Sequence, residues 1–292
     1  MMIIDGKKIA SEISVELKQK VDLIKGRKPC LALIIVGDNP SSIIYVRSKE
    51  KKCAEIGLES KIYRLDRHTS EDELLNDIDK LNQDENVDGI LVQMPLPKHI
   101  NEQHACEAIT PKKDVDGFNP YNVGGLLMGS SEAFASCTPL GIKTLLEKYK
   151  IDPTGKHVVI LGRSNIVGKP MASLMLQKKA FANATVTVAH SRTQNLEAIC
   201  SQADILISAI GSANFVKREM VKEGAVVIDV GINRVEDSSL PKGYRIVGDV
   251  DFNGVLEKVS YITPVPGGVG PMTVVMLIQN TLKSYYSKIT GN

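Results

Sequence analysis

The stretch Val158-Val159-Ile160-Leu161-Gly162-Arg163-Ser164-Asn165-Ile166-Val167-Gly168-Lys169-Pro170 joins an apolar run, a polar turn between glycines and the start of an apolar helical pattern. This order is typical of a strand, a phosphate-binding loop and a helix. A helix N-terminus offers unpaired N–H groups and partial positive charge, and Gly162 and Gly168 would let a pyrophosphate approach the backbone closely. Because Ser164 stands where the usual fingerprint has its middle glycine, an ordinary tight strand-to-helix turn is an alternative interpretation.

The strand expected at 184–189 bears on this choice, because it ends in His190-Ser191-Arg192. In a dinucleotide-binding fold the end of the second strand meets the adenosine ribose, where NAD enzymes offer Asp or Glu. Here the chain offers the hydroxyl of Ser191 and the guanidinium of Arg192, with Arg163 as a second cation. Since arginine binds phosphate bidentately, the residues favour NADP, unless Arg192 merely ends a strand in solvent.

Composition narrows the class of protein. The chain has 292 residues, of which 43% are hydrophobic and 24% charged, which suits two globular domains. A net charge of +2 argues against nucleic acid or an anionic membrane as the main partner. No apolar run is long enough for a signal peptide or a membrane span. The scattered cysteines and histidines predict reduced thiols, no bound metal and a cytoplasmic location.

Strand and helix patterns alternate along the whole chain, which predicts an α/β fold with a parallel sheet in each half. Strands are expected at 31–37, 61–65, 89–93, 158–161, 184–189, 204–208, 225–230 and 245–247. We expect an N-terminal α/β domain of residues 1–140 plus 272–292, to which the C-terminal helix returns. Residues 141–271 would form a doubly wound parallel, Rossmann-like NADP domain.

The helix expected at 41–56 carries Tyr45 and Lys49 on one face, together with Ser42 and Cys53. This face would lie near the carboxyl end of a buried strand, where open α/β sheets bind ligands. A desolvated lysine there can act in acid-base or electrostatic catalysis, and Tyr45 can stack on a flat ligand. A surface lysine beside a core tyrosine is the alternative.

Two further polar groups follow strands or turns in the first half. Gln93 ends an apolar strand before Met94-Pro95-Leu96-Pro97, and it either binds a ligand or ties down that loop. Asp114 and Asp116 lie in a turn, but no third ligand for a metal is near them. An acceptor for an N–H-rich heterocycle fits this turn better, and a plain Asx-turn remains possible.

The segment Thr263-Pro264-Val265-Pro266-Gly267-Gly268-Val269-Gly270-Pro271-Met272-Thr273 precedes the last helix. Three glycines in four residues, pinned by prolines, give a backbone that can lie against a planar ligand. A turn between domains is the competing interpretation.

Five motifs occur in order along nearly the whole chain: Tyr45-x3-Lys49, Val92-Gln93-Met94-Pro95-Leu96-Pro97, Lys113-Asp114-Val115-Asp116-Gly117-Phe118, Gly162-Arg163-Ser164-x-Ile166-Val167-Gly168 and Pro264-x-Pro266-Gly267-Gly268-Val269-Gly270-Pro271-Met272-Thr273. Together they resemble the bifunctional methylenetetrahydrofolate dehydrogenase/cyclohydrolase family. Departures are small: Ala189 stands where the family often has Cys, and Ser136 where it often has Pro.

The resemblance implies NADP-dependent oxidation of methylenetetrahydrofolate and hydrolysis of the methenyl product to 10-formyltetrahydrofolate, within one-carbon metabolism and purine biosynthesis. It also implies a homodimer with the active site in a cleft between domains. Lys49 would be the catalytic lysine, tuned by Gln93, while Tyr45 would stack near the folate and Asp116 would anchor the pterin. The implied folate contacts are Tyr45, Lys49, Val92, Gln93, Met94, Asp116, Pro264, Pro266, Gly267, Gly268, Gly270 and Pro271. The implied NADP contacts are Gly162, Arg163, Ser164, Ser191, Arg192 and Ile232.

Two rival classes remain at this point. One is another two-domain NADP oxidoreductase that acts on a small acid, although the glycine-proline segment favours a large flat ligand. The other is an NADP-binding regulatory protein without catalysis, in which Lys49 and Gln93 would be incidental.

Overall fold

The structure is a computed structural model that describes residues 1–290. The chain divides into two compact units, which we call unit 1 (Met1–Ala10 and Thr138–Thr273) and unit 2 (Ser11–Cys137 and the chain from Val274 onward). The chain crosses between the units at three points, each within a helix: α1 (Gly6–Asp22), the start of α6 (Cys137–Lys148) and α10 (Val269–Thr290). We expected residues 1–10 to belong to the N-terminal α/β domain. In the structure β1 (Met2–Ile3) instead pairs with β11 (Tyr261–Ile262) of unit 1.

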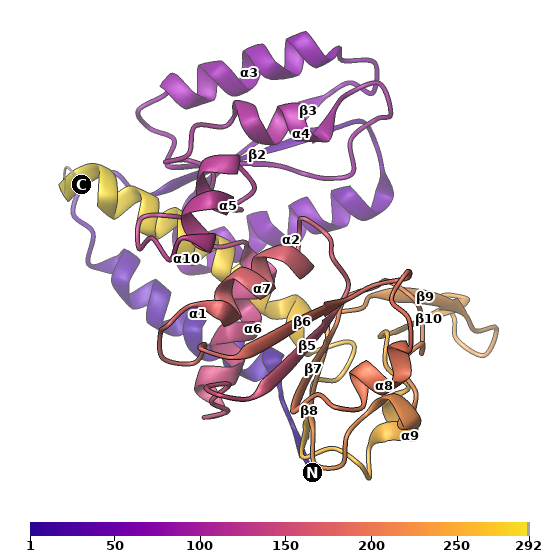
Figure 1. Cartoon of the computed structure of the whole chain (residues 1–292). Helices are drawn as coiled ribbons and strands as arrows, with labels where there is room; N and C mark the ends of the chain where they lie inside the picture. The colour runs from indigo at the N-terminus through magenta and orange to yellow at the C-terminus, as the bar shows by residue number, and fades with distance from the viewer. Residues whose placement is uncertain (291–292) are drawn as a thin grey trace. The chain divides into compact units, whose positions relative to one another are not determined.

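Unit 2 is built on a parallel sheet of order β3-β2-β4. Its strands are β2 (Cys30–Val36), β3 (Glu59–Leu65) and β4 (Gly89–Val92). Every residue of β2 is buried, as the continuous apolar run predicts for a parallel strand covered on both faces. One face packs against α3 (Glu71–Gln83) and α4 (Glu102–Ala108) through a shared apolar cluster. In Figure 1, α2 (Pro40–Ile56), α1 and the yellow α10 lie on the other side of this sheet.

Capping residues mark the ends of the helices of unit 2. Asn39 caps α2, because its side chain accepts hydrogen bonds from the N–H groups of Ser41 and Ser42, and Pro40 fits the first turn. Gly57 ends α2 in the left-handed conformation, with φ of 92°. Ser70 and Glu73 form a reciprocal capping box at the start of α3.

The capping box of α3 gives a simple test of these local rules. Replacing Ser70 by Ala removes the acceptor for the Glu73 N–H, so we expect the free energy of unfolding to fall by about 1 kcal/mol. Urea denaturation followed by circular dichroism measures this loss. The control is Ser11→Ala on the exposed surface of α1, for which we expect a change within about 0.5 kcal/mol.

Unit 1 is a parallel sheet of order β1-β11-β8-β7-β5-β6. The inner strands are β5 (His157–Leu161), β7 (Ile205–Ser208) and β8 (Val226–Asp229), with β6 (Thr185–Ala189) at one edge. The chain passes from β5 outward to β6 and then back across to β7. This reversal is the topological switch point of a doubly wound sheet, at which such folds bind nucleotides.

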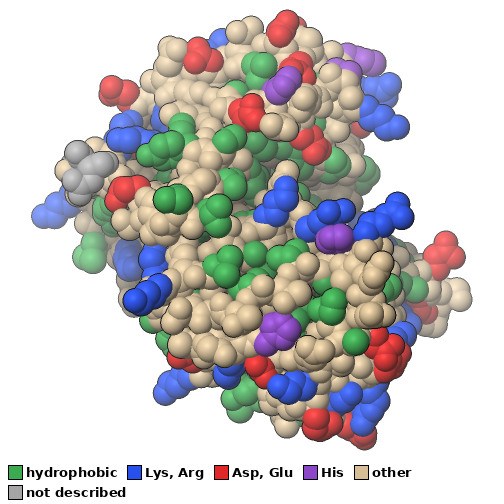
Figure 2. Space-filling view, in the orientation of Figure 1, with side chains coloured by type: hydrophobic (Ala, Val, Ile, Leu, Met, Phe, Trp, Pro, Cys, Tyr) green, Lys and Arg blue, Asp and Glu red, His purple; other side chains and the backbone are tan. Residues whose placement is uncertain are grey.

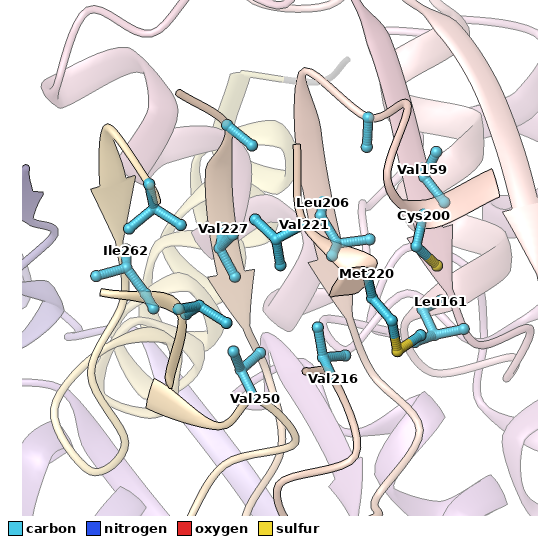
Figure 3. Packing of buried hydrophobic residues seen from close by; sticks show 14 of the residues in the cluster. Val159, Leu161, Cys200, Leu206, Val216, Met220, Val221, Val227, Val250 and Ile262 are labelled. Carbon is cyan, nitrogen blue, oxygen red and sulfur yellow. The ribbon is translucent and has the colours of Figure 1, made fainter. Parts of the chain in front are cut away.

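One face of this sheet carries a large apolar core. Alternate strand residues Val159, Leu161, Leu206, Val227 and Ile262 point into it and are buried. Figure 3 shows Cys200, Met220 and Val250 meeting them from the segments that cover this face. These segments include α8 (Leu196–Cys200), the short helix η1 (Arg218–Met220) and α9 (Phe252–Val255). The remaining helices of the second half are α6 (Cys137–Lys148) and α7 (Gly168–Leu176).

One strand expected in the parallel sheet lies outside it. Residues 245–247 belong to β10 (Tyr244–Val247), which pairs antiparallel with β9 (Asn233–Glu236) in a separate hairpin. Both strands are largely accessible to solvent, so their side chains do not join the apolar core.

The surface mixes charges of both signs. In Figure 2 the Lys and Arg side chains of the visible face are interspersed with acidic and hydrophobic ones. Within residues 1–290, no helix combines the length and the apolar character that crossing a membrane requires.

Candidate active site

The first group of predicted site residues lies in unit 2, at the carboxyl edge of its sheet. The Lys49 ammonium, from the middle of α2, donates a hydrogen bond of 2.8 Å to Oε1 of Gln93, which directly follows β4. Gln93 Nε2 donates to the Met94 carbonyl at 2.7 Å, so its oxygen is the atom turned to the lysine. Residues 44 positions apart in the chain thus meet at this edge. We call Tyr45, Lys49, Gln93 and Asp116 the lysine site.

The turn at 113–119 separates the roles of its two carboxylates. Asp114 is buried and accepts hydrogen bonds from the N–H groups of Gly117, Phe118 and Asn119 and from the Asn122 amide. It therefore holds the turn together. Gly117 adopts a φ of 74°, and a Cβ there would lie 2.8 Å from the Phe134 carbonyl oxygen, so only glycine fits.

Asp116 faces Lys49 in this arrangement, and their charges influence each other. Burial lowers the pKa of Lys49 below the usual value for lysine, while the Asp116 carboxylate partly opposes this shift. Burial also raises the pKa of Asp116, against the attraction of the Lys49 cation. A lysine with a lowered pKa beside a carboxyl group can exchange protons near neutral pH more readily than a surface lysine.

Tyr45 lies one turn before Lys49 on the same helix, and its side chain is 45% exposed. Its ring is therefore accessible to a flat ligand, and the alternative of a core tyrosine is wrong. Val92 is buried in β4, whereas Met94 is half-buried in the loop that follows.

Two residues near Asp116 were not predicted from the sequence. Asn280 of α10 is buried and donates to the carbonyls of Val115 and Ala135, at 2.8 and 3.0 Å. The Cys137 thiol donates to the Val115 carbonyl, and burial raises its pKa well above the usual value. The available signal for Asn280 was an amide next to Gln279 within the apolar pattern Val274–Leu282. This contact also places α10 against unit 2, which confirms the predicted return of the C-terminal helix.

The second group of predicted residues lies in unit 1, where the phosphate-loop stretch forms a strand, a loop and a helix as predicted. Gly162 has a φ of 123°, and a Cβ on it would lie 2.3 Å from the Ala209 carbonyl oxygen. A Cβ on Gly168 would lie 2.2 Å from the Gly162 carbonyl oxygen. Ser164 uses its hydroxyl to accept the Val167 N–H at 3.1 Å, so this serine braces the loop where the fingerprint has glycine.

Residues 163–166 of this loop are exposed, as are Ser191 and Arg192 at the end of β6. Two hydrogen bonds fix the turn after β6. The His190 N–H donates to the Thr193 hydroxyl, and the Thr193 N–H donates to the His190 carbonyl. Two exposed guanidinium groups, of Arg163 and Arg192, and the hydroxyls of Ser164 and Ser191 thus stand at the ends of neighbouring strands β5 and β6. This donor set suits the phosphates of a dinucleotide.

The glycine-proline segment 264–271 lines a cavity of about 160 Å³ in unit 1, together with Ile232 and residues at the end of β8. Ile232 is 53% exposed, and its side chain lies 3.8 Å from the position of a Cβ on Gly270. Part of the glycine content serves packing, because a Cβ on Gly268 would lie 2.6 Å from the Pro264 carbonyl oxygen. The exposed members Pro266 and Gly270 leave backbone accessible to a ligand.

Within residues 1–290, no group of three or more His, Cys, Asp or Glu side chains is placed to hold a metal ion. A dinucleotide, by contrast, fits unit 1. At the switch point residues 163–166 of the phosphate loop are exposed between the two packed glycines, and cationic and hydroxyl side chains lie there.

The fold and these two groups of residues define an α/β protein with one dinucleotide-binding unit and one unit that carries a half-buried lysine at the edge of its sheet. The chain belongs to the tetrahydrofolate dehydrogenase/cyclohydrolase family. The family's catalytic-domain model matches residues 4–116, and its NAD(P)-binding-domain model matches residues 136–289.

Individual relatives agree over the whole length. The bifunctional protein FolD of Prosthecochloris aestuarii is 57% identical over 289 residues, which cover 98% of both chains. The crystal structure of the bifunctional enzyme FolD from Campylobacter jejuni is 51% identical, covers 99% of both chains and has a TM-score of 0.93. The Trypanosoma brucei methylenetetrahydrofolate dehydrogenase-cyclohydrolase, solved in complex with NADP cofactor and inhibitor, is 41% identical with a TM-score of 0.92 and covers 99% of this chain and 98% of its own.

Proposed function

We propose that this chain is a bifunctional enzyme that oxidises 5,10-methylenetetrahydrofolate with NADP to the 5,10-methenyl form and hydrolyses that product to 10-formyltetrahydrofolate. The observation that carries the proposal is the Lys49–Gln93–Asp116 arrangement in a chain of this family. Unit 2 supplies the acid-base chemistry, and unit 1 binds the dinucleotide.

For the oxidation, this chain's residues bind and orient. NADP supplies the hydride acceptor when it is bound. Gly162, Ser164 and Arg163 would hold its phosphates at the start of α7, Ser191 and Arg192 would select the 2′-phosphate, and Ile232 would contact the cofactor. Accurate placement of the reacting carbon is the main contribution that a protein makes to such a transfer.

For the hydrolysis, proton transfers must occur at the one-carbon bridge. Water adds to the amidinium carbon of the methenyl form and gives up a proton, which leaves a hydroxyl on that carbon. The bond from the carbon to a ring nitrogen then breaks as the nitrogen gains a proton, and the hydroxyl releases its own proton to solvent as the formyl C=O forms. The Lys49 amine accepts the first proton and returns one to the leaving nitrogen. Gln93 holds the amine in place through its 2.8 Å bond, and the lowered pKa makes the neutral amine accessible.

The remaining assignments concern folate binding. Asp116 accepts hydrogen bonds from the pterin, Tyr45 stacks on the folate, and the backbone of Val92 and Met94 lies beside it. From the glycine-proline segment we assign Pro264, Pro266, Gly267, Gly268, Gly270 and Pro271 to the folate.

The deciding experiment mixes purified protein with methylenetetrahydrofolate and NADP and follows NADPH and the methenyl intermediate together. NADPH that rises while methenyl stays below its uncatalysed level would support both activities. Methenyl that accumulates in step with NADPH would leave only the dehydrogenase. If no NADPH forms, with NAD tested alongside, the chain is not this oxidoreductase.

Replacing Arg192 by Ala tests the choice of cofactor. The guanidinium binds the 2′-phosphate that only NADP carries, so we expect the preference for NADP over NAD to fall several-fold, the effect of losing one exposed charged contact. The ratio of kcat/KM values for the two cofactors measures it. An unchanged ratio would move the assignment to Arg163 or Ser191, whose Ala variants serve as the comparison.

We also propose that the enzyme is a cytoplasmic homodimer, as its resemblance to the family implies. Light scattering coupled to size exclusion should give twice the monomer mass at micromolar concentration. A monomer mass under the conditions of full activity would contradict the dimer.

A further inference from the structure

The Asp249 carboxylate in unit 1 takes no part in the chemistry above, yet it is fully buried. It accepts hydrogen bonds from three consecutive backbone N–H groups, those of Ile210, Gly211 and Ser212, at 2.8, 3.2 and 2.9 Å. The side-chain amide of Asn233 donates a fourth bond of 2.9 Å. A carboxylate with four N–H donors is held firmly, and it holds its donors equally firmly.

These donors belong to two segments at the carboxyl edge of the parallel sheet, which we call loops 209–212 and 230–233: the first follows β7, and the second follows β8 and ends with the first residue of β9. The first loop abuts the phosphate loop, because a Cβ on Gly162 would lie 2.3 Å from the Ala209 carbonyl oxygen. The second presses on Asp249 itself, since a Cβ on Gly231 would lie 2.2 Å from its Oδ1. The gap between β5 and β7 is the switch point, so both loops border the place where the dinucleotide binds.

A second buried carboxylate fixes Asp249 in turn. Asp229 accepts the N–H groups of Gly231, Asp249 and Val250, each at 2.9 Å. Burial raises the pKa of Asp229 to about 6, against these three hydrogen bonds, and the nearby charge of Asp249 adds to the rise. Two buried carboxylates side by side cost stability, and packed apolar residues would stabilise the edge better if stability were the only requirement.

We propose that Asp249 is a positioning residue for NADP, whose carboxylate holds loops 209–212 and 230–233 in the conformation that the dinucleotide binds. The inference rests on the proposed function. Preformed loops spare the binding step the entropy of ordering them, so Asp249 acts on cofactor affinity without touching the reacting atoms. Hydrolysis of methenyltetrahydrofolate consumes no NADP and gives an internal control within the same protein.

The test is Asp249→Asn, which keeps the size of the side chain but turns an NH₂ group toward N–H donors. We expect the Kd and KM for NADP to rise about tenfold, as for the loss of a charge-assisted hydrogen bond. The hydrolysis of methenyltetrahydrofolate, assayed without NADP, should stay within about twofold of wild type. The matched control is Asp251→Asn, which removes a surface carboxylate that caps α9 and pairs with Lys217; we expect its Kd for NADP to equal that of wild type.

Asn233→Ala provides a second, milder variant that removes one of the four donors, and its Kd for NADP should rise in the same direction by a smaller factor. Folded variants with a wild-type Kd for NADP would overturn the positioning role while leaving the proposed function intact. Equal loss of both activities in both variants, in proportion to the folded fraction, would also overturn it in favour of a purely structural role. A wild-type protein that does not bind NADP would instead defeat the proposed function itself.

Discussion

Lys49→Met should abolish the hydrolysis of methenyltetrahydrofolate while the fold and NADP binding survive. The expected loss is at least about 100-fold, the lower end of what a positioned general acid-base group contributes. Methionine keeps the length of the side chain, and it cannot accept or return a proton. Because burial already disfavours the Lys49 charge, we expect no loss of stability from its removal. The decay of methenyl absorbance above the uncatalysed rate measures the activity, and NADP titration measures the binding.

The control for this variant is Lys51→Met, two residues further along α2, where the side chain is exposed. It removes the same positive charge from the same helix, so a general electrostatic effect would appear in both variants. Lys49→Arg adds a chemical test, since a guanidinium stays protonated at any working pH and should also fail to support hydrolysis. An unimpaired hydrolysis rate in Lys49→Met would remove the lysine from the mechanism.

The lysine site shows what a sequence can and cannot predict. Helical spacing places Tyr45 and Lys49 on one face, and the end of an apolar strand places Gln93 at the sheet's carboxyl edge, so their proximity follows from the topology of parallel sheets. The spacing of the residues does not choose between Asp114 and Asp116, because both lie in one turn; only the family resemblance singled out Asp116. The choice depends on which carboxylate the backbone of 117–119 surrounds, and that requires the folded turn.

In unit 1, too, some strands could be predicted from local sequence, whereas others depend on contacts between residues far apart in the chain. The strands β5, β7 and β8 can be predicted because they are continuous apolar runs. In contrast, β1 and β11 have two residues each and no recognisable pattern. Their pairing joins residues about 260 positions apart, so the assignment of Met2 and Ile3 to this sheet depends on tertiary contacts. The role of Asp249 could not be predicted from the sequence either, because its partners Ile210 and Asn233 lie elsewhere in the chain.

Asp116→Ala should weaken folate binding by about 1–3 kcal/mol, because a buried heterocycle N–H would lose its acceptor. Titration with a folate in the absence of NADP measures the affinity. Asp72→Ala, which removes an exposed carboxylate of α3 in the same unit, is the control and should bind folate as wild type does. Unchanged folate affinity in Asp116→Ala would contradict the assignment.

The same carboxylate also predicts a shift in pH dependence, for which Asp116→Asn is the better variant because it keeps an oxygen acceptor. In the wild type the Asp116 charge raises the pKa of Lys49 and thereby limits the fall that burial causes. Removing that charge lowers the pKa of Lys49 further, so the neutral amine persists to lower pH. If the neutral amine accepts the proton from water, hydrolysis rises with pH through this pKa, and the midpoint moves to lower pH in the variant. Rates of methenyl hydrolysis, corrected for the uncatalysed reaction at each pH, measure the midpoint and the direction of the profile; a rate that falls as pH rises through the midpoint would mean that the protonated lysine is the active form.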